Sequence, residues 1–315
     1  MASVMDRMNT NDDRSEGREA RMHSSTQQRI AELRKAGQQK VRAEEYAAAI
    51  DLYDEALSLA TDEEERELLT INKADAMIAL GLTGPEVQQL PSIALRRRNL
   101  QHTILSAYAL MYKHRMSGDI KRALFYGQVA LGAAMEADND AWKIGVLNDL
   151  AIASEMDSQF ERAIEYLESA RALLGSIQDE AERELSEVAI LPNLAYNKML
   201  VGETKEGIRM MHNVIDRIQS PSGIADAYLE LCYGYLDLEM YDEALKYGQI
   251  GLALATSDRA IRNGYYLVGE AAYKGGDIAA AEQHFDELAK FYPEFHNLKS
   301  LLFAIDLRSM VNFRL

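Results

Sequence analysis

The residues best suited to binding chemistry in this sequence are Tyr108, Tyr112 and Arg115. Their spacing of i, i+4 and i+7 places them on one face of a helix. A phenol ring is a rigid contact surface with a polar tip, and a guanidinium group binds carboxylates through paired hydrogen bonds. We therefore predict that this face contacts a partner whose acidic residues lie near Arg115.

Catalytic chemistry has no comparable signal. None of the six histidines lies within four residues of another, which excludes the paired-histidine helix face of a zinc peptidase. The sole cysteine, Cys232, is expected to fill a small packing position rather than act as a nucleophile. Glycine-rich phosphate loops are absent from the sequence, and the acidic residues are dispersed. We predict that the protein is not an enzyme and holds neither metal nor cofactor.

Composition narrows the classes of partner and compartment. The formal net charge is −16, which disfavours general nucleic-acid binding because phosphate neutralisation supplies most of that affinity. No run of apolar residues has the length of a signal peptide or a membrane span. One cysteine permits no intramolecular disulfide. The expectation is a cytoplasmic protein that binds neither nucleic acid nor membrane.

The elements that must position these residues repeat along the chain. A small residue opens the second helix of a helical hairpin at steps of 37, 37, 40, 44, 37 and 37 residues. A step in this range indicates a repeat array. The positions are Ala49, Glu86 (a degenerate copy), Ala123, Ala163, Gly207, Ala244 and Ala281.

Three segments follow from this pattern. Residues 1–25 are polar and without apolar period, so we expect a disordered arm. Residues 26–293 hold the hairpins. Residues 294–315 carry an apolar stripe that favours a C-terminal capping helix over the alternative, a helix that forms a homodimer.

Individual residues predict how the hairpins close. Ala36 and Gly37 let the two helices of the first hairpin approach, and Gly275–Gly276 ends a helix with a left-handed cap. Pro91 should kink or shorten the second helix of hairpin two.

The chain resembles a tetratricopeptide-repeat protein. The family alternates aromatic and small residues in register, matched here by Tyr228, Leu231, Cys232, Tyr235, Ala244; by Tyr265, Gly269, Ala281, Phe285, Pro293; and by Ala36, Gly37, Ala49, Tyr53, Ala56. The matches cover about residues 27 to 293, and the steps exceed the family's usual 34. The resemblance implies an all-α, right-handed α-solenoid of about seven hairpins.

In such solenoids the first helix of each hairpin lines a concave groove. Projecting the register onto these helices gives the predicted partner-binding residues Tyr108, Tyr112, Arg115, Asn148, Tyr196, Tyr233, Tyr266 and Tyr273. Packing between helices is the competing interpretation for any of these tyrosines, and it is the one we favour for Tyr228, Tyr235 and Tyr265.

Some tetratricopeptide domains bind chaperone C-terminal carboxylates with Asn, Lys and Arg. The sequence matches that clamp at Asn72, but Gln38 replaces another Asn, and Leu105–Met111 contains no Lys or Arg. We do not predict chaperone-tail binding.

The charges form two bands. Residues 96–122 hold seven basic residues against Asp119 alone, and residues 136–187 hold fourteen acidic residues against four basic ones. Mutual neutralisation between neighbouring repeats is one interpretation, and a bipolar groove that orients a charged partner is the other.

The resemblance and the charge pattern together predict a scaffold or adaptor that holds a protein or peptide in its concave groove. The alternative is a non-catalytic regulatory subunit that acts on an enzyme or transcription complex through its convex face or residues 294–315.

Overall fold

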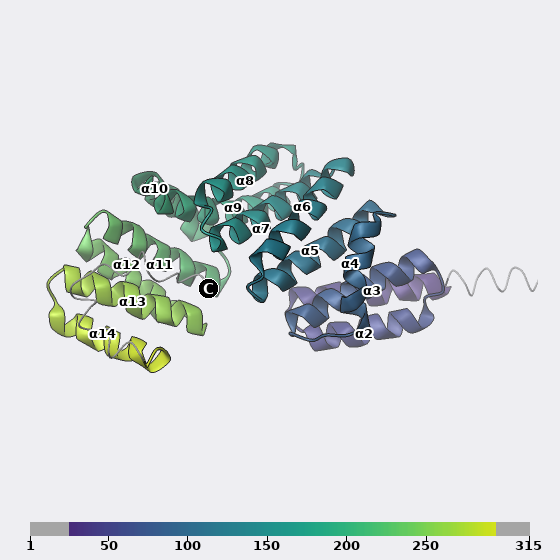
Figure 1. Cartoon of the computed structure of the whole chain (residues 1–315), viewed down its shortest axis with the longest axis horizontal. Helices are drawn as coiled ribbons and strands as arrows, with labels where there is room; N and C mark the ends of the chain where they lie inside the picture. Colours follow the sequence, from purple (N-terminus) through teal and green to yellow (C-terminus); the bar gives the residue numbers. More distant parts are fainter. Residues whose placement is uncertain (1–24, 294–315) are drawn as a thin grey trace, which may run out of the picture. The chain divides into compact units, whose positions relative to one another are not determined.

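The computed structural model describes residues 25–293, and every regular element in that range is helical (Figure 1). The predicted all-α array of seven helical hairpins is confirmed. The first hairpin pairs a helix over residues 25–42 with α2 (Tyr46–Leu59). The others are α3 (Glu63–Ala79) with α4 (Pro85–Arg96), α5 (Leu100–Met116) with α6 (Ile120–Glu136), α7 (Asp140–Met156) with α8 (Phe160–Leu173), α9 (Glu180–Leu200) with α10 (Thr204–Val214), α11 (Pro221–Asp237) with α12 (Tyr241–Leu254), and α13 (Asp258–Lys274) with α14 (Ile278–Phe291).

The helices form two compact units. Unit 1 contains the described residues up to 117 together with 125–137, and unit 2 contains residues 118–124 together with 138–293. Inside each unit the first helices of successive hairpins touch, as α3 does with α5 and α11 with α13. First helices therefore share a face, and second helices cover their other side. The arm over residues 1–24 and the predicted capping or dimerising helix over 294–315 lie outside the described residues.

The small residue of the repeat is the fourth residue of its helix in six of the seven second helices. All six are buried: Ala49, Ala123, Ala163, Gly207, Ala244 and Ala281. The degenerate copy differs because Glu86 is the second residue of α4, where Val87 and Leu90 enter the core instead. Glu86 is half-buried and accepts a hydrogen bond from Lys73 Nζ at 2.8 Å.

Helix lengths explain the uneven steps. A first helix of 17 residues and a second of 14, as in α11 and α12, give the step of 37. The step of 40 arises because α6 has 17 residues instead of 14. The step of 44 arises because α9 has 21 residues and a 3-10 turn, Leu174–Ser176, extends α8.

Each first helix from α3 onward starts with a side-chain cap. An Asp, Asn or Ser oxygen accepts the backbone N–H three residues later, which satisfies a donor that the helix leaves free. The capping residues are Asp62, Asn99, Asn139, Asp179, Ser220 and Ser257. These residues mark the boundary between hairpins.

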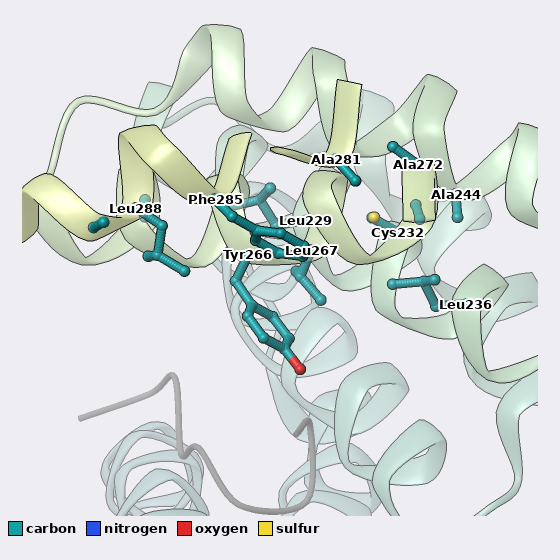
Figure 2. Close-up of a cluster of buried hydrophobic side chains, with 13 residues drawn as sticks. Leu229, Cys232, Leu236, Ala244, Tyr266, Leu267, Ala272, Ala281, Phe285 and Leu288 are labelled. Carbon is teal, nitrogen blue, oxygen red and sulfur yellow. The ribbon is translucent and has the colours of Figure 1, made fainter. Parts of the chain in front are cut away.

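Close helix approach fixes the pairing inside a hairpin. A Cβ added to Gly37 would lie 2.5 Å from the ring of Tyr53, and one added to Gly269 would lie 2.6 Å from the ring of Phe285. Both rings are buried, and both follow their glycine by sixteen residues. Figure 2 shows Phe285 packed with Leu267, Leu229 and Cys232 in the core of unit 2. The predicted role of Gly37 is therefore confirmed.

Two further helix ends agree with the sequence. Gly276 has φ +93° directly after α13, in the left-handed region that favours glycine. Pro91 lies inside α4, which has only 12 residues, so the predicted shortening is confirmed, although the helix continues past the proline to Arg96.

Substitution of Gly207 by Ala should destabilise the protein. The added Cβ would lie 2.4 Å from the backbone oxygen of Ala195, which cannot rotate away. We expect the free energy of unfolding of unit 2 to fall by about 1–3 kcal/mol, the usual cost of overpacking. Thermal unfolding followed by circular dichroism measures it. Gly145→Ala is the matched control, because nothing lies within 4 Å of its added Cβ and the helix gains up to about 1 kcal/mol from the alanine. Equal midpoints for the two variants would contradict the close approach.

Candidate functional site

The residues that prompted the binding prediction in unit 1 lie on α5. Tyr108, Tyr112 and Arg115 are all half-buried, as one shared face requires. The Arg115 guanidinium carbon lies 5.4 Å from the centroid of the Tyr112 ring, within cation–π range. This cation is therefore already stacked on an aromatic side chain of its own helix.

A carboxylate on the neighbouring first helix has no such contact. Asp75 of α3 is half-buried, and no side chain in residues 25–293 donates a hydrogen bond to it or forms an ion pair with it. The nearby cations are engaged elsewhere: Arg34 binds Glu65 at 3.2 Å, and Lys73 binds Asp54 at 2.7 Å. Burial without compensation raises the pKa of the Asp75 carboxyl.

Two tyrosines of α2 lie within electrostatic range of Asp75. Burial first, and then the charge of Asp75, raise the pKa of Tyr53 to about 12. The pKa of half-buried Tyr46 is also raised, chiefly by burial, with further contributions from Glu44, Tyr112 and Asp75. Asp75 is thus within electrostatic range of two rings from α2. One helical turn before Asp75, the Asn72 side-chain nitrogen is buried and has no hydrogen-bond partner among the described residues.

In unit 2 the shared face of first helices carries side-chain amides. Asn193 Nδ2 on α9 donates to Asn148 Oδ1 on α7 at 3.1 Å. One turn along, Asn197 Nδ2 donates to the buried Glu155 carboxylate at 2.7 Å and to the backbone oxygen of Asn193 at 2.8 Å. Asn197 Oδ1 is buried and accepts no hydrogen bond from the described residues.

Aromatic side chains continue this face. Tyr196 of α9 meets Tyr233 of α11 edge to face, with ring centroids 5.7 Å apart. Both are half-buried, as are Asn148 and Tyr273. The structure therefore brings Asn148 beside Asn193 and Tyr196 beside Tyr233.

Tyr266 does not fit the predicted partner-binding set. Its side chain is only 1% exposed, and its ring centroid lies 6.5 Å from that of Phe285 (Figure 2). A residue in this position stabilises the α13–α14 hairpin and offers no contact surface, so we exclude it from the candidate site. The other seven predicted residues are half-buried, and their binding role stays a prediction.

The sequence did not reveal Asn193 as a member of the candidate site in unit 2, nor the two buried residues that support it, Asn197 and Glu155. Asn193 and Asn197 are spaced i, i+4 around Tyr196, which is the same helical signal that singled out Tyr108 and Tyr112. Their partners across the helix pair could not be read from the spacing.

The tyrosines assigned to packing are confirmed. The rings of Tyr235 and Tyr247 stack with their centroids 5.2 Å apart, and the rings of Tyr228 and Tyr247 stack with theirs 6.1 Å apart. The Tyr235 hydroxyl is hydrogen-bonded to His212 Nε2 at 2.9 Å. Burial lowers the pKa of His212. Tyr265 contacts the ring of His284, 6.1 Å away.

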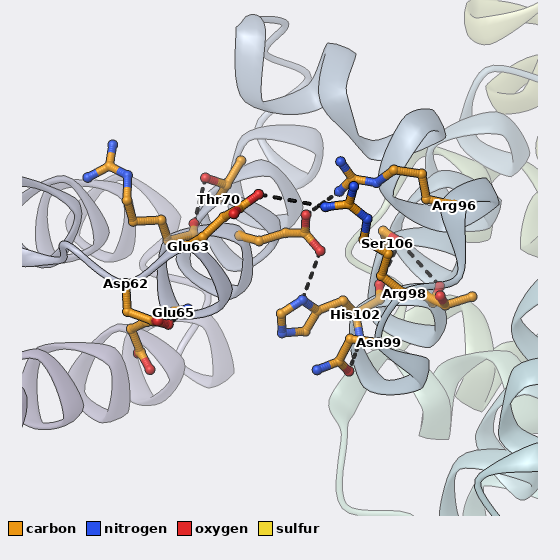
Figure 3. A network of polar contacts seen from close by, with 12 residues as sticks. Asp62, Glu63, Glu65, Thr70, Arg96, Arg98, Asn99, His102 and Ser106 are labelled. Carbon is orange, nitrogen blue, oxygen red and sulfur yellow. Dashed lines mark hydrogen bonds and ion pairs between the residues drawn. The ribbon is translucent and has the colours of Figure 1, made fainter.

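The start of the basic band has internal partners. Arg96 forms an ion pair with Glu67, Arg98 lies 3.8 Å from Glu63, and Arg97 binds Glu136 at 2.7 Å. The nearly buried His102 joins the same network through Nδ1, 2.9 Å from Glu67 (Figure 3). Neutralisation between neighbouring helices therefore accounts for these three arginines.

The described residues contain neither a metal-ligating cluster nor a membrane-spanning helix. In residues 25–293 no group of three or more His, Cys, Asp or Glu side chains has an arrangement that could hold a metal ion. No helix in the same range is both long enough and apolar enough to cross a membrane.

Solved structures with a similar backbone identify the fold. No family model matches the sequence, and no curated protein sequence matches it. A Rap protein complexed with competence and sporulation factor is 15% identical and aligns with a TM-score of 0.66 over 85% of this chain and 77% of its own. A tetratricopeptide repeat protein from Parabacteroides merdae is 13% identical to this chain. It aligns with a TM-score of 0.53 over 84% of this chain and 93% of its own. The chain has the fold of a tetratricopeptide-repeat array.

A third tetratricopeptide-type structure was solved with a ligand. NprR, in complex with its cognate peptide NprX, is 16% identical to this chain, with a TM-score of 0.64 over 89% of this chain and 83% of NprR. At this level of identity the similarity establishes the tetratricopeptide-repeat fold and leaves the ligand of this chain open.

Replacing Asp75 by Asn should stabilise unit 1 at neutral pH. Because the folded-state pKa of Asp75 is raised, its contribution to stability is greatest below its unfolded pKa and is lost as the pH rises through the folded pKa. The Asn variant should therefore have a higher urea midpoint than the wild type at pH 7, and the gap should close below about pH 3. The control is Asp51→Asn, which removes the same charge from an exposed position of α2. A wild type more stable than the Asp75→Asn variant at pH 7 would show that Asp75 has a stabilising partner.

Proposed function

We propose that this tetratricopeptide-repeat protein is a scaffold or adaptor that binds a peptide, or an extended segment of a partner protein, against its first helices. The observation that carries the proposal is the amide-lined face of α7 and α9. Asn148 and Asn193 are half-buried there, and the buried Asn197 supports the face from below through its hydrogen bond to Glu155. Such amides can donate to and accept from a peptide backbone regardless of its side chains.

The tyrosines supply the second requirement of a binding surface. Tyr196, Tyr233 and Tyr273 are half-buried on first helices of unit 2, and Tyr108 and Tyr112 on α5 of unit 1. Tyrosine is enriched among the residues that dominate binding energies, because its ring buries much area at low entropic cost. The peptide in the NprR structure shows that a similar fold can hold a ligand of this class.

Two finer expectations belong to the same proposal. Acidic partner residues near Arg115 would add carboxylates to a guanidinium that already lies over Tyr112. A protein rather than a nucleic-acid partner agrees with the net charge of −16. The proposal also includes a cytoplasmic location.

The proposal is tested by presenting a pool of random synthetic heptapeptides to the immobilised full-length protein. Truncating both Tyr196 and Tyr233 to Ala should reduce the capture of wild-type-enriched peptides at least about tenfold, because the loss of two aromatic contacts costs more than about 1.4 kcal/mol. Mass spectrometry of the eluted peptides measures it.

Tyr166→Ala is the matched control, since Tyr166 is a half-buried tyrosine on a second helix, α8. Circular dichroism confirms that helicity is kept in all variants. Equal capture by the wild type and the double variant would remove this face from consideration, and the same pool applied to Tyr108→Ala/Tyr112→Ala/Arg115→Ala would test the face of α5.

A further inference from the structure

The feature of unit 1 that folding does not explain is the group of polar atoms left open around Asp75. Buried or half-buried carboxylates are ordinarily paired, since desolvation penalises the charged form. Elsewhere on α3 this rule holds: Glu65 binds Arg34, and Glu67 binds Arg96 and His102. Asp75 alone among the α3 carboxylates named here lies in a desolvated position without a cation.

Asn72 is a second unsatisfied polar group next to Asp75, and it offers a hydrogen-bond donor where Asp75 offers an acceptor. Its side-chain nitrogen is a buried donor with no acceptor among the described residues, and it lies one helical turn before Asp75 on the same face. An open donor and an open acceptor side by side cost stability in the free protein. Sites that break local packing rules in this way are typically functional.

The surroundings favour a positive ligand group. Tyr46 is half-buried and lies within electrostatic range of Asp75. The ring of Tyr112 on α5 already carries the Arg115 guanidinium, so we leave it out of the site. A carboxylate beside aromatic rings is the arrangement that binds ammonium and guanidinium groups, through an ion pair and cation–π contacts. The whole chain carries a net charge of −16, which draws cations toward it.

We propose that Asp75, with Asn72 and the ring of Tyr46, forms a subsite of unit 1 that binds a cationic group of a peptide: the guanidinium of an arginine or the ammonium of a lysine. Asp75 accepts from the cation, and Asn72 donates to a carbonyl oxygen of the same ligand. The inference rests on the proposed function, because it specifies the chemistry of the peptide that this protein takes.

A metal ion and an anion are the other ligands that such a position could attract. A metal site needs several ligating side chains, and the described residues offer no such group around Asp75. An anion would be repelled by the carboxylate. The peptide cation satisfies both open groups at once.

The test uses the full-length protein and a set of acetylated, amidated five-residue peptides, Gly-Ala-X-Ala-Gly, with X as Arg, Lys, citrulline or Glu. Citrulline keeps the shape and most of the donors of arginine without its charge. We expect the Arg and Lys peptides to bind at least tenfold more tightly than the citrulline and Glu peptides, as measured by chemical-shift titration. Asp75→Asn should abolish that preference, and Asp51→Asn, which removes an exposed charge from the same unit, should keep it.

Each outcome decides the subsite. A preference for cations that persists in Asp75→Asn overturns it, as does binding of all four peptides with equal affinity, and so does binding of none. The urea unfolding curve of Asp75→Asn is the check that this variant is folded. If the cationic preference depends on Asp75 while the Tyr196→Ala/Tyr233→Ala protein captures the random pool as well as the wild type, the subsite stands and only the proposed face of unit 2 falls.

Discussion

Six of the seven hairpins depend on one close approach between two helices, made where the second helix carries a residue with little or no side chain. These six residues, from Ala49 to Ala281, are buried, and at Gly207 even one methyl group would meet the backbone of α9. Because interiors are packed to crystal density, such positions tolerate almost no change of volume. The constraint falls on the sides of the helices that face one another. The outer side of each first helix is therefore free to carry residues chosen for something other than packing.

That freedom is used for polar side chains that packing alone does not require. Asn148 and Asn193 bond across α7 and α9, and Asn197 leaves an oxygen open. Asp75 and Asn72 in unit 1 leave two more groups open. The free-energy cost of these unsatisfied groups is small compared with the stabilisation from the repeated cores, because every hairpin contributes its own buried residues. A repeat array can therefore hold unsatisfied groups in place rigidly enough to meet a ligand.

Much of the architecture could be predicted from sequence because it depends on local spacing. The spacing of sixteen positions from Gly37 to Tyr53, and again from Gly269 to Phe285, is visible without a structure. The capping residues from Asp62 to Ser257 were also visible, and reading them would have located each first helix to the residue. The division into two compact units, by contrast, was not predicted, although the change from the basic band to the acidic band falls near residues 117–138, where the units meet in sequence.

The candidate site could be predicted only in part, because it depends on helix rotation and on distant partners. Tyr265 and Tyr266 are adjacent, yet about 100° of helical rotation separates a ring that contacts His284 from one that enters the core. The bond between Asn148 and Asn193 joins residues 45 apart and depends on how α7 and α9 lie against each other. Likewise, Asp75 is left without a cation because Arg34 and Lys73 reach other carboxylates, which no spacing rule reveals.

The buried position of Cys232 allows local opening of the protein to be measured by thiol labelling. It is the sole cysteine of the sequence, it is fully buried, and Gly248 leaves room for its sulfur against α12. A thiol reagent can reach the sulfur only when α11 and α12 separate, since reaction requires an accessible thiolate. The labelling rate under native conditions therefore reads out the free energy of opening of this one hairpin, separately from the unfolding of the remaining repeats.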